Sequence, residues 1–135
     1  MKSKTEPSDV RASFDRCEAA GDFAKKFYDV FLNSSPEIAP LFAKTDFKQQ
    51  RKILRATVYI MVTRDVTDPN AQETLGRIGH SHSRAKLNIR PELYDLWLDS
   101  LCETAKAMDP KWTPELERSW RECMAPGIAL ITSLY

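Results

Sequence analysis

Residues 48–63, KQQRKILRATVYIMVT, determine whether this chain is all-helical or mixed. Taken alone, the last seven of these residues predict a strand, because β-branched side chains favour extended structure. The apolar positions before them, however, recur at helical spacing, and this period continues through the segment without a break. The resulting stripe, which has one polar member, is Phe47, Gln50, Leu54, Val58 and Met61. We therefore predict a single helix from Asp46 to about Arg64.

Helix-start and helix-stop residues divide the rest of the 135-residue chain into further helices. We expect a disordered polar tail over residues 1–8 and a single domain over residues 9–135. The other predicted helices are 9–20, one ending at Asn33, a short one opened by Ser35 and Pro36, 70–86, one from Pro91 and one from Thr113. No segment predicts a strand, so the expected fold class is all-α.

The charge balance and the cysteine content exclude several classes of function. The 20 Lys and Arg residues against 19 Asp and Glu residues leave a net charge of +1, which argues against nucleic-acid or membrane-surface partners. No apolar run reaches the ~20 residues that cross a bilayer, and the first residues lack the apolar core of a signal peptide, so we expect a cytoplasmic protein. The 3 cysteines form no CxxC pair, which excludes a zinc ribbon. We expect them to pack as small hydrophobic residues, with a reactive thiol as the alternative.

Two histidines are candidates for chemistry. His80 and His82 point about 200° apart on a helix, so one metal ion cannot easily take both. His82 lies four residues after Ile78 and seven after Leu75, so we expect His82 on the buried face and His80 in solvent. Gly79, one turn earlier, leaves room for a close approach. A buried histidine needs a hydrogen bond or a metal, and both a satisfied core histidine and a metal ligand remain open for His82.

Two further polar side chains fall on apolar faces. Gln50 lies in the stripe of the 46–64 helix, and Tyr28 lies in a helix whose apolar residues spread too widely for one surface stripe. The simpler interpretations are a boundary glutamine that reaches water and a core tyrosine bonded to a backbone carbonyl. Together with His82, however, these side chains place polar tips on three predicted helices, which suggests a shared cavity.

Three stretches resemble bacterial globins. Residues 27–42, FYDVFLNSSPEIAPLF, resemble the second and third helices of a bacterial globin. Residues 48–54, KQQRKIL, are similar to the distal helix of flavohaemoglobins. Residues 75–94, LGRIGHSHSRAKLNIRPELY, resemble the proximal helix and its exit, and IGHSHSR within them most resembles the globin-coupled sensors. The resemblance covers residues 9–135 and implies a bacterial single-domain globin with a three-over-three helical fold.

The register of this resemblance implies a heme site. The separations from Tyr28 to Phe42 and from Gln50 to His82 are those of flavohaemoglobins. His82 then matches the proximal histidine that ligates the iron of a non-covalent heme b, and Tyr28 matches the tyrosine that faces bound gas. Gln50 and Leu54 match the distal polar and apolar positions, and Phe42 matches the phenylalanine on the porphyrin face. The implied apolar wall is Phe42, Phe47, Leu54, Val58, Trp97 and Leu101.

Two departures from the family pattern bear on function. The segment between His82 and Pro91 is two residues longer than in flavohaemoglobins, and Tyr135 stands where they carry a glutamate that polarises the proximal histidine. Without that carboxylate, a peroxidase-like or nitric-oxide-oxidising role is less favoured. Four basic residues are candidates for contacts to the heme carboxylates, with solvated surface charge as the alternative: Lys48, Arg51, Arg84 and Lys86.

The function that the resemblance implies is binding of O2 or another diatomic gas, as a gas sensor or an oxygen carrier, rather than catalysis. The alternatives are a nitric oxide dioxygenase that needs a separate reductase, and a globin-like signalling module without heme. The resemblance to coupled sensors also implies a homodimer or a signalling partner. We expect such an interface on helices 91–108 and 114–134, with Trp112, Leu134 and Tyr135 as an exposed apolar patch.

Overall fold

The computed structural model describes residues 7–63 and 65–135, and within them the chain is all-helical, as predicted. The seven helices of these described residues are α1 (Pro7–Ala20), α2 (Phe23–Leu32), α3 (Ile38–Leu41), α4 (Phe47–Thr63), α5 (Pro69–Ser81), α6 (Leu93–Met108) and α7 (Pro114–Ser133). The β-branched segment 57–63 is therefore helical. The predicted tail falls mostly on residues 1–6, which lie outside the described residues, as does residue 64, and residues 7 and 8 already belong to α1.

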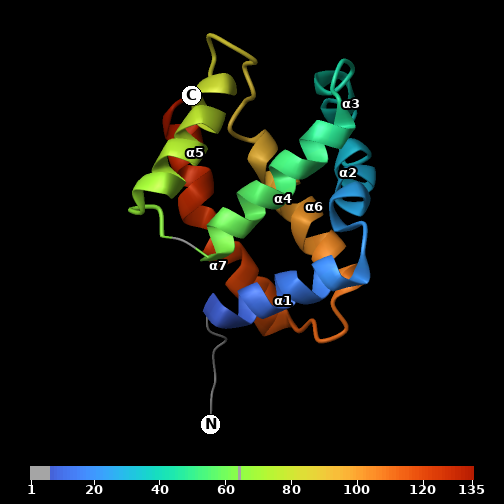
Figure 1. The fold of residues 1–135 in the computed structure, drawn as a ribbon. Helices are drawn as coiled ribbons and strands as arrows, with labels where there is room; N and C mark the ends of the chain where they lie inside the picture. The colour runs from blue at the N-terminus through green and yellow to red at the C-terminus, as the bar shows by residue number, and fades with distance from the viewer. Residues whose placement is uncertain (1–6, 64) are drawn as a thin grey trace.

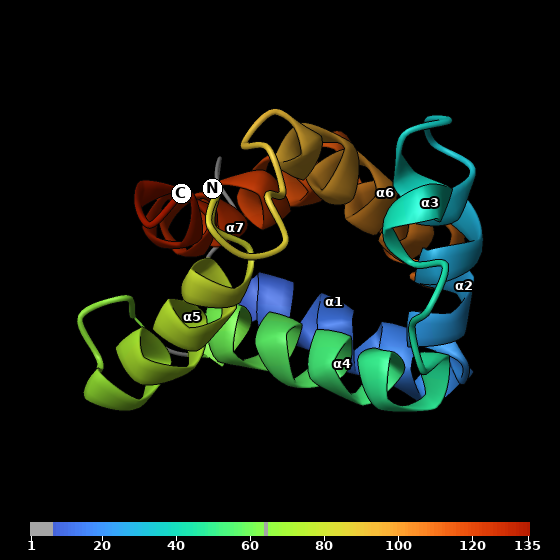
Figure 2. The same ribbon diagram turned by 90° about the horizontal axis from the view of Figure 1, so that it is seen from above.

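The helices pack in two layers. α1, α4 and α5 lie on one side of the molecule and α6 and α7 on the other, and α2 and α3 close one end (Figures 1 and 2). α2 packs along α6, and α5 packs along α7. α4 crosses the middle of the view in Figure 1, and Figure 2 shows α5 near one of its ends and α2 near the other. In the part of the chain that the structure describes, no helix is long and apolar enough to cross a bilayer.

The core follows the predicted apolar faces. α2 is buried on two sides, because Ala24, Phe27, Tyr28 and Phe31 are all nearly inaccessible to solvent. In the α4 stripe, the members toward the C-terminal end are buried and the first two, Phe47 and Gln50, are half-buried. The β-branched residues of this segment favour a strand by themselves. In the helix, however, the apolar stripe is removed from water, and the free energy of that burial outweighs the strand preference.

A buried polar network ties α1 to the other end of the chain. Asp109 accepts hydrogen bonds from Ser13 at 2.5 Å and from Arg16 at 2.6 and 2.9 Å. Trp120 Nε1 in turn donates to the Ser13 hydroxyl at 3.0 Å. Burial alone raises the pKa of Asp109, but the bonds from Arg16, Ser13 and the Lys111 backbone N–H outweigh it and lower that pKa to about 2.

The end of α5 differs from the prediction. The helix ends at Ser81 rather than at Lys86, so His82 is its C-terminal cap and not a residue of the helix. The hydroxyls of Ser81 and Ser83 donate to the carbonyls of Ile78 (2.9 Å) and His80 (2.7 Å), and such bonds compete with helix continuation. The following loop then folds back, and the Ile89 N–H donates to the His82 carbonyl at 2.9 Å.

Two other helices begin two residues later than predicted. α3 begins at Ile38 rather than Pro36, and α6 begins at Leu93 rather than Pro91. Before α3, the Ser35 hydroxyl accepts a bond from the Glu37 N–H at 3.2 Å, so the serine stabilises a turn there. α7 begins as predicted, because the Thr113 side chain accepts from the Leu116 N–H at 3.0 Å.

Candidate functional site

The main cavity, of about 490 Å³, lies between α4, α5, α6 and α7, with a contribution from α2. Sites for small molecules commonly enclose about 300–1,000 Å³ behind a mostly apolar lining with a few polar groups. The lining here has that character and consists of Tyr28, Gln50, Ile53, Leu54, Ala56, Thr57, Met61, Thr74, Arg77, Ile78, Ser81, His82, Leu87, Tyr94, Trp97, Ile128 and Ile131.

His82 lines the main cavity from the loop that follows α5. Its Nδ1 lies 2.7 Å from the Tyr94 hydroxyl of α6. Burial lowers the pKa of His82, so the neutral imidazole is favoured. Among the described residues the hydrogen bonding of this ring uses Nδ1 only. When the Nδ1–H donates to Tyr94, the lone pair of Nε2 is available to a metal ion.

Tyr28 and Gln50 form a second polar group on the same cavity. Gln50 Nε2 donates to the Tyr28 hydroxyl at 3.0 Å, and this bond joins α4 to α2. Burial raises the pKa of Tyr28 to about 12, and the Gln50 bond only partly opposes that effect. The phenol therefore stays protonated at neutral pH and retains a hydrogen to donate. The three polar tips that the sequence analysis singled out thus meet at one cavity.

The predicted apolar wall divides into three groups. Leu54 and Trp97 line the main cavity directly. Phe42 and Phe47 are half-buried and lie beside the Tyr28 ring, with ring centroids 5.7 and 5.5 Å from it. The third group does not line this cavity, because Val58 and Leu101 are fully buried among core side chains. Their packing positions the helices that carry the lining residues.

The four basic candidates are not among the residues that line the main cavity. Lys48 and Arg51 line a separate surface depression, together with Glu18 and Asp22. The Arg84 guanidinium stacks over the Tyr135 ring at 4.8 Å from its centroid. Lys86 is exposed. The basic residue that does line the cavity is Arg77, which pairs with Glu73 at 2.9 Å on the surface of α5.

Tyr94 is the site residue that sequence reasoning missed. It lies three residues before Trp97 and seven before Leu101, so helical spacing places it on their face. That spacing was the available signal. Tyr135, expected at the position of a proximal glutamate, instead donates its hydroxyl to Asn88. The partner of the His82 imidazole is therefore a neutral phenol, and burial raises the pKa of that Tyr94 phenol to about 12.

The cavity offers one metal-ligating nitrogen, from His82, and two hydrogen-bond donors, from Tyr28 and Gln50. It does not offer the several side-chain ligands that hold a bare metal ion. Among the described residues, no group of three or more His, Cys, Asp or Glu side chains is placed to hold a bare metal ion. His82 offers one nitrogen, and His80 is exposed, as predicted. Such a site suits a prosthetic group that carries its own metal and needs one axial ligand from the protein.

Comparisons with known proteins agree with the fold. The globin family model matches residues 25–129. A crystal structure of the protein PA3967 from Pseudomonas aeruginosa PAO1, described as structurally highly homologous to a human hemoglobin, is similar to this chain. The two chains are 41% identical, the match covers 96% of this chain and 97% of that one, and the TM-score is 0.85. A search of curated proteins gave no match.

Proposed function

This chain belongs to the globin family, and on that premise we propose that it holds a non-covalent heme b in the main cavity, with His82 as the axial ligand. Heme and gas binding in general follow from the family. The finer proposal is that the chain binds O2 or another diatomic gas on the side of Tyr28 and Gln50, as a gas sensor or an oxygen carrier.

One observation carries the proposal: Tyr28 and His82, which lie near opposite ends of α4, line the same mostly apolar cavity. Tyr28 belongs to α2 and His82 follows α5, and these helices lie near opposite ends of α4 (Figure 2). Both residues line the main cavity. A cavity with a metal ligand from one end and a hydrogen-bond donor from the other fits a flat cofactor with a gas ligand beside it.

The residues present also fit heme in their chemistry. The neutral His82 imidazole has Nε2 available, and its Nδ1 is held by Tyr94. Leu54, Trp97 and Ile131 provide apolar contact surface and exclude water. When bound, heme supplies an iron centre whose gas affinity depends on the axial ligand and on the polarity of the cavity. The protonated Tyr28 hydroxyl would donate a hydrogen bond to a gas held in this cavity, and Gln50, which donates to that hydroxyl, would hold it in place.

The phenol beside His82 favours reversible gas binding over oxidative chemistry. A carboxylate partner makes an imidazole a stronger electron donor, whereas a protonated phenol does so much less. The second candidate function, a nitric oxide dioxygenase with a separate reductase, is distinguished by rapid re-reduction of the heme by a cellular electron donor. The third candidate, a signalling module without heme, is distinguished by failure of the purified chain to take up hemin.

A cytoplasmic location and a homodimer through α6 and α7 complete the proposal. Part of the apolar patch expected there packs within the chain: Trp112 lies 6.1 Å from Trp120 between ring centroids. Leu134 lies against Gly79, where an added Cβ would be 2.7 Å from Leu134 Cδ1. Light scattering over a wide concentration range measures whether enough surface remains for a dimer.

The test of the proposal is the absorption spectrum of the purified chain titrated with hemin. We expect a Soret band that His82→Ala abolishes, because that variant removes the axial nitrogen. His80→Ala is the matched control, since it removes an exposed imidazole two residues away and should retain the band. Equal loss in both variants, or an unchanged band in His82→Ala, contradicts the assignment.

A further inference from the structure

Positive charge is concentrated around the surface depression that borders the N-terminal half of α4. This depression has a volume of about 360 Å³, and five of its lining residues are basic. These five residues, termed the basic face, are Lys25, Lys48, Arg51, Lys52 and Arg55. The acidic residues of the lining are Glu18 and Asp22. Five basic against two acidic residues leave a local charge of +3, whereas the net charge of the whole chain is +1.

Helical spacing groups four members of the basic face on one side of α4. Positions 48, 51, 52 and 55 are separated by three or four residues, so their side chains share one side of the helix. Gln50 and Leu54 lie on roughly the opposite side and line the main cavity. The same two turns of α4 therefore contribute to the main cavity on one side and to the basic face on the other.

Most of the charge on the basic face is unpaired within the chain. Arg55 pairs with Glu18 at 2.8 Å, and Lys25 pairs with Asp29 at 3.6 Å between exposed side chains. Among the residues that the structure describes, the other three members of the basic face form no ion pair. These three cations are therefore available to an external anion.

The arrangement of these cations opposes the stability of the helix that carries them. Like charges four residues apart repel on a helix, and Lys48 is followed at this distance by Lys52, as Arg51 is by Arg55. Lys48 also lies in the first turn of α4, where the helix dipole disfavours a cation. An anionic partner would remove this repulsion, so the arrangement suits a bound state better than the free chain.

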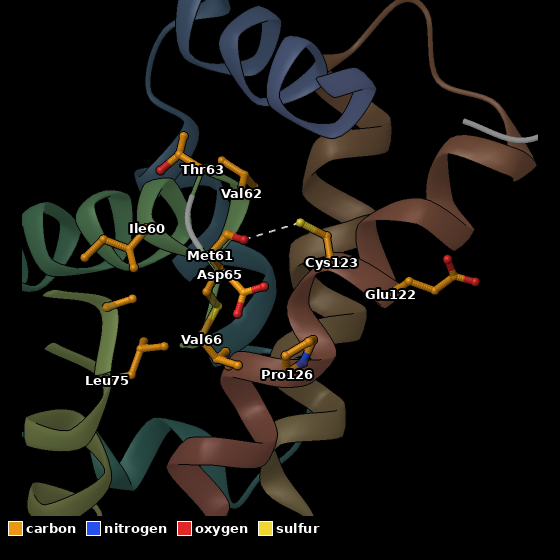
Figure 3. Close-up of a pocket in the computed structure, with 12 residues that line it drawn as sticks. Ile60, Met61, Val62, Thr63, Asp65, Val66, Leu75, Glu122, Cys123 and Pro126 are labelled. Atoms are coloured by element: carbon orange, nitrogen blue, oxygen red, sulfur yellow. Dashed lines mark hydrogen bonds between the residues drawn. The ribbon is translucent and has the colours of Figure 1, made fainter. Parts of the chain in front are cut away.

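The opposite end of α4 has a different character. A mostly apolar cavity of about 410 Å³ lies there against α5 and α7, and Figure 3 shows Glu122 extending away from the group formed by Met61, Val66 and Pro126. All the basic residues of α4 lie within positions 48–55. At 1.5 Å per residue these positions span ~10 Å of the helix, which matches a short run of charged side chains on a partner.

We propose that the basic face is a docking surface for a partner protein that presents a short run of Asp or Glu side chains. Opposite potentials steer two proteins together and fix the register of their contact. Since the whole chain carries +1 and the depression +3, the remainder of the chain carries −2. A nucleic acid or an anionic membrane extends well beyond the basic face and would meet this negative remainder, whereas a local acidic run would not.

The acidic members of the depression favour a protein over a small phosphate ligand. Glu18 and Asp22 both line the depression, so a compact anion placed there would lie beside two carboxylates. A row of acidic side chains can instead follow the cations along α4. This inference needs neither heme nor bound gas, so it goes beyond the proposed function and stands or falls separately from it.

The first test is an NMR titration of the purified full chain with hexaglutamate, the probe for an acidic run. We expect the largest amide shifts at residues 48–55 and at Lys25. The double variant Lys48→Glu/Lys52→Glu reverses two exposed charges of the basic face and should weaken binding by roughly tenfold or more. The matched control Lys106→Glu/Arg118→Glu makes the same change in net charge at exposed residues outside the depression, and should bind within roughly threefold of wild type.

A urea denaturation of the same variants separates lost binding from lost folding. In Lys48→Glu/Lys52→Glu, each new carboxylate lies three residues before an arginine of α4, so repulsion becomes attraction. The unfolding midpoint should therefore equal or exceed that of wild type while binding of hexaglutamate falls.

The titration also distinguishes the other occupants. Localised shifts together with selective loss in Lys48→Glu/Lys52→Glu support the docking surface. Tighter binding of inorganic triphosphate at the same residues would assign a small polyanion to them and overturn the proposal. Binding to vesicles of four parts phosphatidylcholine and one part phosphatidylserine, lost in that variant, would assign a membrane and overturn it too. Shifts spread over the whole surface, or equal loss in the two double variants, would leave only solvated surface charge and likewise overturn it.

Discussion

We expect the Tyr28 hydroxyl to raise the affinity for oxygen by slowing its dissociation. Bound oxygen accepts partial negative charge from heme, and hydrogen bonds to charged groups contribute about 1.5–3 kcal/mol. At about 1.4 kcal/mol per factor of ten, Tyr28→Phe should speed oxygen dissociation by roughly ten- to a hundredfold. Gln50→Leu should have a smaller effect in the same direction, because Gln50 holds the phenol in place. Stopped-flow dissociation measures both variants.

Carbon monoxide dissociation is the control for this experiment, since that ligand carries far less charge and should respond little. Unchanged oxygen dissociation in Tyr28→Phe would mean that the hydroxyl points elsewhere and that Tyr28 is a core tyrosine.

The Tyr94 hydroxyl should affect how tightly the protein binds heme, because it contacts the His82 imidazole. Removing a partner of a ligating histidine commonly costs about 10–100-fold in metal affinity. Tyr94→Phe leaves the ring in place but removes the 2.7 Å contact to His82 Nδ1, so we expect heme affinity to fall within that range while carbon monoxide still binds. Transfer of hemin to excess apomyoglobin gives the loss rate. A rate equal to wild type would show that the phenol does not hold the imidazole.

At the level of single residues, the signal in the sequence was a polar side chain that interrupts an apolar period. Tyr28, Gln50 and His82 stand out in this way, and all three line the main cavity. Val58 and Leu101 have the same apolar spacing as cavity residues, and spacing alone cannot tell a side chain packed against another helix from one that faces an empty space. The hydrogen bond between Tyr94 and His82 could not be predicted from the sequence either, because it depends on the path of the loop between the two residues.

At the level of elements, α5 offers a matched pair of glycines. A Cβ at Gly79 would lie 2.7 Å from Leu134 Cδ1 and 3.1 Å from the Ile131 carbonyl, whereas a Cβ at Gly76 would meet nothing within 4 Å. Gly79→Ala should therefore overpack the α5–α7 contact and lower the free energy of unfolding by about 1–3 kcal/mol. Gly76→Ala should raise it by up to about 1 kcal/mol through helix propensity. Urea denaturation of both variants gives the comparison.

Equal effects of the two glycine substitutions would contradict the close approach of α5 to α7. The close approach at Gly79 was predictable from the sequence, but α5 ends at Ser81, five residues before the predicted end at Lys86. The physical reason is local: the hydroxyls of Ser81 and Ser83 satisfy the helix carbonyls from outside the backbone ladder. The helical pattern of apolar residues continues past this point, so periodicity alone gives no signal of the stop.

At the scale of the whole molecule, Asp109 links stability to acid pH. Its pKa is lowered to about 2 in the folded chain from 3.8, so its contribution is present above about pH 4 and is lost as the pH falls toward 2. A shift of this size corresponds to about 2 kcal/mol. Asp109→Asn should therefore lower the free energy of unfolding at pH 7 by about that amount and flatten its decline below pH 4. Chemical denaturation across this pH range measures the effect.

A steep acid decline that persists in Asp109→Asn would assign the pH dependence to other carboxylates. The global arrangement of helices was predictable, because long apolar periods and helix caps define the elements and the resemblance orders them. The network of Asp109, Ser13 and Trp120 was not, since it joins residues about a hundred positions apart that show no local pattern.

The span of the main cavity along the chain has a consequence for biosynthesis. Its first lining residue is Tyr28 and its last is Ile131. The Ser13 hydroxyl of α1 likewise has its partners late in the chain, at Asp109 and Trp120. A nascent chain emerges from the ribosome N-terminal end first. Translation must therefore pass Ile131 before all the lining residues of the main cavity exist, so the complete cavity forms only after α7 has been synthesised.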